Sequence, residues 1–150
     1  MPRSPSTASR QTGRVLVIDD DMGVRRLLHT LLTAKHLTVV EAESAADAER
    51  RLHEIRPDAI IVDLTLAETR GLELVRRLRR RRELERVPVV LITGSPSDAG
   101  RARALEAGAD DVVAKPFGVA DLQRRVLRFL SQGRLRPRPG AARMAGRVSF

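Results

Sequence analysis

The chain has 150 residues and a formal net charge of +9, and it contains no cysteine. This length suits one domain of about 120 residues with two tails, and the lack of cysteine excludes disulfides and thiol chemistry. No apolar stretch approaches the roughly 18 residues of a membrane span, and the first 13 residues lack the apolar core of a signal peptide. These features predict a soluble cytoplasmic protein.

The excess positive charge is concentrated at the two ends of the sequence. Residues 1–13 contain two arginines and no acid, and residues 131–150 contain five arginines and no acid, so the tails hold seven of the nine excess charges. Both segments are polar and lack apolar periodicity, which predicts disorder. Basic tails can bind phosphates or acidic surfaces, but charge blocks of this kind are usually only solvated.

Five apolar runs predict β-strands. The central run holds three consecutive β-branched residues, Ile60, Ile61 and Val62, which is typical of a strand buried on both faces of a parallel sheet. The other four runs are similarly rich in valine, leucine and isoleucine. They lie at about 14–18, 37–42, 87–92 and 112–114.

The segments between the strands are predicted to be helices. The first has an apolar stripe at i, i+3, i+4, i+7 and i+8, and Asp20 or Asp21 is expected to be its N-cap. Ser44 is expected to cap the second helix, and Gly71 precedes the third. The residues of the first stripe are Val24, Leu27, Leu28, Leu31 and Leu32.

The last two predicted helices differ in their patterning. The fourth, at about 97–107, is rich in alanine and arginine with little apolar periodicity, so we expect it to pack lightly and to be a mobile element. The fifth, at about 119–130, has a clear inward stripe of leucine, valine and phenylalanine. Residues 76–86, at the end of the third helix, hold seven arginines, which we interpret as a solvated helix end rather than a nucleic-acid patch.

Acids follow two of the predicted strands. Asp19, Asp20 and Asp21 come directly after the first strand, and Asp63 ends the central one. If these strands are neighbours, four carboxylates crowd the crevice where open α/β sheets bind ligands. Two unit charges about 4 Å apart repel by roughly 4 kcal/mol at an effective dielectric near 20. The cluster therefore needs a cation, protonation or separation by water, and its oxygens suit Mg²⁺, which keeps several waters.

Two more polar residues end the later strands. Thr93 follows the fourth strand and Lys115 follows the fifth. An ammonium, a hydroxyl and a metal suit an anionic phosphoryl group, and Asp63 is the candidate acceptor because a carboxylate can attack phosphorus to form an aspartyl phosphate. Taken alone, each residue is equally an ordinary turn acid, strand end or surface cation. The functional interpretation rests on the whole set.

The ordered motifs VLVIDDD, IIVDLTL, VVLITGS and GADDVVAKPF resemble the receiver domain of bacterial response regulators, including single-domain chemotaxis-type ones. The resemblance covers residues 14–130, with 1–13 and 131–150 as disordered tails. It implies an α/β fold of the flavodoxin-like (βα)5 type, with a doubly wound five-stranded parallel sheet in the order 2-1-3-4-5.

The resemblance also implies roles for the site residues. Asp63 would accept a phosphoryl group from a histidine kinase or phosphotransfer protein, while Thr93 and Lys115 contact that group. Mg²⁺ would be held by Asp20, Asp63 and the backbone carbonyl of Thr65, with Asp19 assisting through water. The Lys115–Pro116 peptide would be cis.

The sequence departs from the family at two positions. Ala67 stands where the family usually has proline, so the loop after Asp63 is expected to be looser. Val112 stands where the family usually has tyrosine or phenylalanine. A β-branched side chain has few χ1 states and no ring to swing, so the response to phosphorylation is expected to be weaker and more diffuse.

Three functions compete. The first is a phosphorylation-controlled switch without its own output domain, a monomer or weak dimer with an unknown downstream protein. The second is a basic nucleic-acid- or protein-binding module with little switching. Its three phenylalanines offer no platform on which bases could stack. Any nucleic-acid binding is therefore expected to be nonspecific and to come from the tails. The third is a dehalogenase-type phosphatase, which would need an acid where Thr65 stands. We therefore expect a switch with at most slow self-phosphorylation and self-dephosphorylation, not an enzyme.

Overall fold

A parallel five-stranded sheet runs through the middle of the computed structural model, which describes residues 13–65 and 71–132. The strand order is β2-β1-β3-β4-β5, which confirms the predicted order. The two expected tails, apart from the few residues that adjoin the domain, and the loop around Ala67 lie outside the described residues. The strands are β1 (Arg14–Ile18), β2 (Thr38–Ala42), β3 (Ala59–Asp63), β4 (Val89–Thr93) and β5 (Asp111–Ala114).

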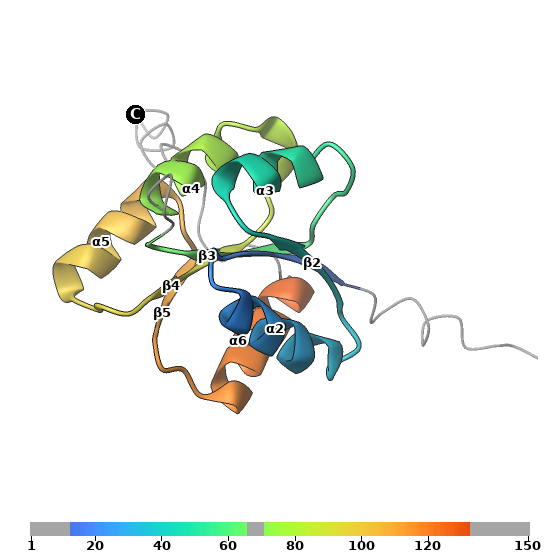
Figure 1. Cartoon of the computed structure of the whole chain (residues 1–150). Coiled ribbons are helices and arrows are strands. Elements are labelled where there is room, and N and C mark those ends of the chain that lie inside the picture. Colours follow the sequence, from blue (N-terminus) through green and yellow to red (C-terminus); the bar gives the residue numbers. More distant parts are fainter. Residues whose placement is uncertain (1–12, 66–70, 133–150) are drawn as a thin grey trace, which may run out of the picture.

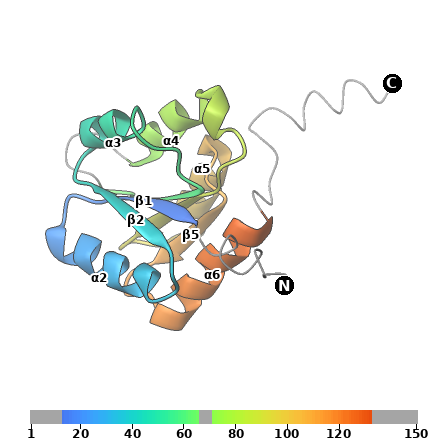
Figure 2. The same cartoon turned by 90° about the vertical axis from the view of Figure 1, so that its right-hand side faces the viewer.

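Helices cover both faces of the sheet. Helices α2 and α6 lie on one face, and α3, α4 and α5 lie on the other (Figures 1 and 2). This is the doubly wound α/β architecture expected from alternating strands and helices. The helices are α2 (Met22–Thr33), α3 (Ala45–Arg51), α4 (Gly71–Arg79), α5 (Asp98–Ala107) and α6 (Val119–Gln132), with a short 3₁₀ helix, η1 (Arg82–Leu84), after α4.

The strands supply a hydrophobic core to each face because successive side chains of a strand point in opposite directions. In β1, Leu16 and Ile18 pack into the core beneath α3, α4 and α5. Val15 and Val17 pack into the other core, against α2 and α6. The continuous apolar runs that predicted the strands are therefore a direct result of burial on both faces.

Strand β3 occupies the centre of the sheet and positions the site. All five of its residues are buried, and it pairs in parallel with β1 and β4. Ile18 of β1 lies opposite Val62 of β3, so the residues that follow these two positions emerge side by side at the same edge.

The helices follow the predicted pattern with three differences. Leu27 is 45% exposed although it belongs to the apolar stripe of α2; consecutive residues differ by about 100° around a helix axis, which places Leu27 at the margin of the stripe beside buried Leu28. Helix α3 ends at Arg51, although Leu52 and Ile55 continue the inward spacing of its alanines, and α6 continues to Gln132, two residues beyond its expected end. Helix α5 buries only Ala104 and Ala107, in line with its expected light packing.

One arginine of the 76–86 run corrects our interpretation of that run as a solvated helix end. The side chain of Arg79 is buried, and it donates hydrogen bonds to the backbone carbonyls of Gly108, Leu84 and Val87. It also forms an ion pair with buried Asp110, at 2.7 Å. Its position was readable from helical spacing, because Arg79 follows Val75 by four residues on the inward face.

No helix within the described ranges is both long enough and apolar enough to cross a bilayer. The described helices instead place one face against the sheet and expose the other.

Candidate functional site

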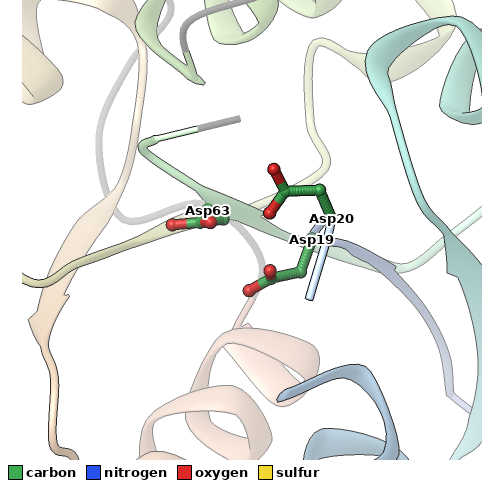
Figure 3. A group of neighbouring side chains, drawn as sticks. All are labelled: Asp19, Asp20 and Asp63. Atoms are coloured by element: carbon green, nitrogen blue, oxygen red, sulfur yellow. The ribbon is translucent and has the colours of Figure 1, made fainter. Parts of the chain in front are cut away.

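Three acids from two neighbouring strand ends converge at the carboxyl edge of the sheet (Figure 3). Asp19 and Asp20 follow β1, and Asp63 ends β3. Carboxylate oxygens of the three side chains lie within 4.8 Å of one another. Asp19 and Asp63 are almost fully buried, whereas Asp20 is exposed. The sequence therefore predicted the acids that meet here.

Asp21, the fourth acid expected at this edge of the sheet, has a structural role. One side-chain oxygen of Asp21 accepts hydrogen bonds from the backbone N–H groups of Gly23 and Val24, at 2.7 and 3.1 Å. Asp21 is thus the N-cap of α2, one of the two residues expected in that role. Its own N–H donates to Asp19 Oδ1 at 2.9 Å, which orients the carboxylate of Asp19.

Lys115 brings a positive charge to the acids. Strand β5 ends at Ala114, and the backbone N–H of Lys115 donates to the carbonyl of Thr93. The Lys115–Pro116 peptide is cis, as expected. The ammonium Nζ lies 3.5 Å from Asp63 Oδ1 and 3.9 Å from Asp19 Oδ2. One ammonium therefore faces two buried carboxylates.

Two threonines border Asp63. Thr93 ends β4, which pairs with β3, and is 3% exposed; its Oγ1 accepts a hydrogen bond from the N–H of Ser95. The N–H and the hydroxyl of Thr65 both lie 3.3 Å from Asp63 Oδ1. The expected role of the Thr65 carbonyl as a metal ligand stays a prediction.

Helix α4 begins directly behind Asp63. A Cβ on Gly71 would lie 2.6 Å from the carbonyl oxygen of Asp63 and 2.7 Å from the Cα of Leu64. Such distances are too short for any side chain, so this close approach requires glycine. The Gly71 N–H donates to the Leu64 carbonyl and fixes the start of the helix beside the site.

Asp19 is the acid most affected by its surroundings. Burial raises its pKa from the ordinary value of 3.8 to about 6, and the charges of Asp63 and Asp20 add to this rise. The hydrogen bond from the N–H of Asp21 and the charge of Lys115 act in the opposite direction. The rise in the pKa of Asp19 thus comes mainly from burial, and the neighbouring acids contribute to it.

The donor set fits a small divalent cation. Among the described residues, Asp19 Oδ2 is buried and has no hydrogen-bond partner, which is an unusual state for a carboxylate oxygen. A cation would satisfy this oxygen and offset the repulsion among the acids. All available donors are oxygens, and one acid is exposed, which leaves room for metal-bound water, as Mg²⁺ prefers.

Sequence reasoning missed two residues beside the cluster, Arg25 on α2 and Glu41 on β2. Arg25 Nη1 donates to the backbone carbonyl of Asp19 at 2.7 Å, and Arg25 Nε donates to Glu41 Oε1 at 3.2 Å. No sequence pattern links these residues, because a contact between a helix and an edge strand sixteen positions away depends on the folded chain.

Comparisons with known proteins agree with this geometry. The family model described as the response regulator receiver domain matches residues 15–127. The phosphate regulon transcriptional regulatory protein PhoB of Rhizobium meliloti is 37% identical, over 81% of this chain and 53% of its own length. The regulatory protein VirG of Agrobacterium fabrum is 35% identical, over 99% of this chain and 56% of its own length.

A solved structure of a response regulator resembles this chain in both sequence and fold. A putative response regulator from Chloroflexus aurantiacus has a TM-score of 0.76 and 30% identity, and the match covers 81% of this chain and 99% of that one. The chain spans about half the length of the curated relatives it matches. With a matching family model over most of its length and the acid cluster in place, the chain belongs to the response regulator receiver domain family.

Proposed function

We propose that this receiver domain is a phosphorylation-controlled switch in which Asp63 accepts a phosphoryl group in a Mg²⁺-dependent reaction. The observation that carries the proposal is the meeting of Asp19, Asp20 and Asp63 within 4.8 Å, with Lys115 Nζ 3.5 Å from Asp63. Receiver domains act in two-component systems, and the donor would be the phosphohistidine of a histidine kinase or phosphotransfer protein.

In the transfer, an oxygen of Asp63 forms a bond to phosphorus as the bond from phosphorus to the donor nitrogen breaks, and the leaving imidazole keeps that electron pair. The aspartyl phosphate carries about one more negative charge than the carboxylate did. Lys115 is placed to interact with this charge, and the Thr93 hydroxyl lies at the end of the neighbouring strand. Mg²⁺ bound at the acid cluster would neutralise charge on the transferring group.

The same residues favour a switch over an efficient phosphatase. Thr65 contacts Asp63 through its hydroxyl and N–H, at the position where dehalogenase-type enzymes place a second acid. A threonine cannot act as a general acid or base near neutral pH. We therefore expect at most slow self-phosphorylation and self-dephosphorylation, and an output that depends on an unidentified downstream protein.

Intact-mass spectrometry after incubation with acetyl phosphate tests the proposal. The wild type should gain one phosphoryl group with Mg²⁺ and none with excess EDTA. Asp63→Asn should gain none, whereas Asp98→Asn, the same change at an exposed acid on α5, should be labelled like the wild type. Equal labelling of Asp63→Asn would refute the assignment of the acceptor.

A further inference from the structure

Arg25 contacts the backbone of the acid cluster from helix α2. It belongs to the first turn of α2, and its side chain is only 13% exposed. Nη1 donates to the Asp19 carbonyl at 2.7 Å, and Nε donates to Glu41 Oε1 at 3.2 Å. One guanidinium therefore connects the β1–α2 turn to strand β2.

The position of the Asp19 carbonyl affects the orientation of two acids of the site. The carbonyl belongs to the peptide unit that joins Asp19 to Asp20, and because that unit is planar, fixing the carbonyl restricts the backbone directions of both acids. The N–H of Asp19 is already held by the carbonyl of Ala42 on β2, at 3.1 Å. The Arg25 contact completes the restraint on the other side of the residue.

Glu41 keeps Arg25 in place. One of its oxygens accepts from Arg25 Nε, and the other lies 3.1 Å from His29 Nδ1, one turn further along α2. The use of two donors in different directions requires the rigid fork of a guanidinium, since an ammonium is a single point charge on a flexible stem.

We propose that Arg25 is a positioning residue for the cation site: it ties the Asp19 carbonyl to Glu41 and so holds Asp19 and Asp20 against their mutual repulsion. The inference rests on the proposed binding of Mg²⁺ by the acid cluster. Partners of this kind, which orient the ligands without touching the metal, commonly change metal affinity by 10- to 100-fold when they are removed.

Magnesium titration of the full chain tests the proposal. The chain has no tryptophan or tyrosine, so the amide NMR signals of Asp20 and Asp21 are a suitable readout. Arg25→Ala should weaken Mg²⁺ binding by about tenfold, and Arg25→Lys should be intermediate because it restores one contact at most. Arg26→Ala, which removes the exposed neighbouring arginine, should bind like the wild type.

A double-mutant cycle separates positioning from general stability. Glu41→Ala should weaken Mg²⁺ binding when Arg25 is present and have no further effect in Arg25→Ala, because both changes break one chain of contacts. Melting without Mg²⁺ is measured in parallel, and if Arg25→Ala does not fold, Arg25→Lys and Glu41→Ala are compared.

The outcomes are distinct. Wild-type affinity in Arg25→Ala, or an equal loss from Glu41→Ala in both backgrounds, would overturn the positioning role alone. If Arg25→Ala melts at a lower temperature but binds Mg²⁺ with wild-type affinity, Arg25 contributes only to stability. That result would also overturn the positioning role. No response of the wild type to Mg²⁺ would overturn the proposed function and this inference together.

Discussion

Asp19 is buried beside two other acids, and one of its oxygens accepts no hydrogen bond from the described residues. Its raised pKa of about 6 means that the folded protein binds this proton more tightly than the unfolded chain does. Between about pH 4 and pH 6 the folded state therefore holds more protons. By linkage, the free energy of unfolding decreases as the pH rises through that range.

Asp19→Asn should remove this pH dependence. Without Mg²⁺, the variant should unfold at nearly the wild-type urea concentration at pH 4 and be more stable than the wild type at pH 7. A shift of about two pKa units corresponds to up to about 3 kcal/mol. Addition of Mg²⁺ at pH 7 should stabilise the wild type more than the variant. A stability difference that is the same at both pH values would contradict the assigned cause.

The sequence was sufficient to predict which acids form the cluster, because a parallel sheet brings strand ends together wherever they fall in the chain. It was not sufficient to divide their roles. Asp19, Asp20 and Asp21 are chemically identical and adjacent, yet one is buried, one is exposed and one caps a helix. Those differences arise from backbone direction at the strand end, which composition does not encode.

At the scale of elements, burial explains what was predictable. The strands were recognised because both faces are covered, so that their apolar runs are uninterrupted. The long helices α2 and α6 were recognised because only one face of each is buried, which gives their apolar residues a helical period. Helix α3 ended earlier than its apolar spacing indicated. Arg79 was misinterpreted because the charge of the 76–86 run was weighed above its helical spacing, and its acceptors, the carbonyls of Gly108 and Leu84, are apparent only in the folded chain.

Replacement of Arg79 should therefore be costly. Its guanidinium joins the end of α4 to η1, to the residue that caps the end of α5 and to Asp110, directly before β5. Arg79→Met leaves Asp110 buried without that cation, and such losses typically cost about 3–5 kcal/mol. Urea unfolding of Arg79→Met and of Arg80→Met, at the exposed neighbour, measures the effect. If both variants lose the same stability, the buried network is unimportant.

We expect helix α5 to change its position or mobility when Asp63 is phosphorylated. It borders a cavity of about 490 Å³ that is lined in part by Thr93, Arg101 and Val112. Thr93 Oγ1 accepts from the N–H of Ser95 at 3.0 Å, so a displacement of this hydroxyl pulls on the loop before α5. Val112 has no ring that could change rotamer, so we expect the response to pass through the loop and the helix.

Hydrogen exchange with and without beryllofluoride tests this route. The amides of residues 94–107 should change their exchange rates. Those of β5 should change only slightly. Changes at 76–86 instead would point to the arginine-rich end of α4 as the output surface. Unchanged exchange at both places, despite beryllofluoride binding, would mean that this receiver does not switch.

At the scale of the whole molecule, most of the net charge of +9 comes from the arginines of residues 1–13 and 131–150 and not from the domain between them. Many arginines of the described domain are paired with acids, among them Arg25 with Glu41, Arg77 with Glu49 and Arg125 with Asp111. The arginines of residues 1–13 and 131–150 have no acid within the same segments. Binding to polyanions is therefore expected to depend on those segments.

Any DNA binding should be weak, nonspecific and steeply dependent on salt. The logarithm of the binding constant should fall linearly with the logarithm of salt concentration, with a slope of about −0.9 per phosphate neutralised. Replacement of the five arginines within 131–150 by glutamine should flatten that slope while Mg²⁺ binding is unchanged. Tight binding to one DNA sequence that resists salt would favour the nucleic-acid function instead.

Gly13 and Leu130, at the two ends of the described domain, lie close together. A Cβ on Gly13 would be only 3.1 Å from Leu130 Cδ1, so the chain enters β1 and completes α6 at the same place. That place is the amino edge of the sheet, about one strand length, roughly 17 Å, from the acids. Gly13 and Leu130 therefore lie at the edge of the sheet opposite the acids, away from the side on which a phosphodonor would approach Asp63.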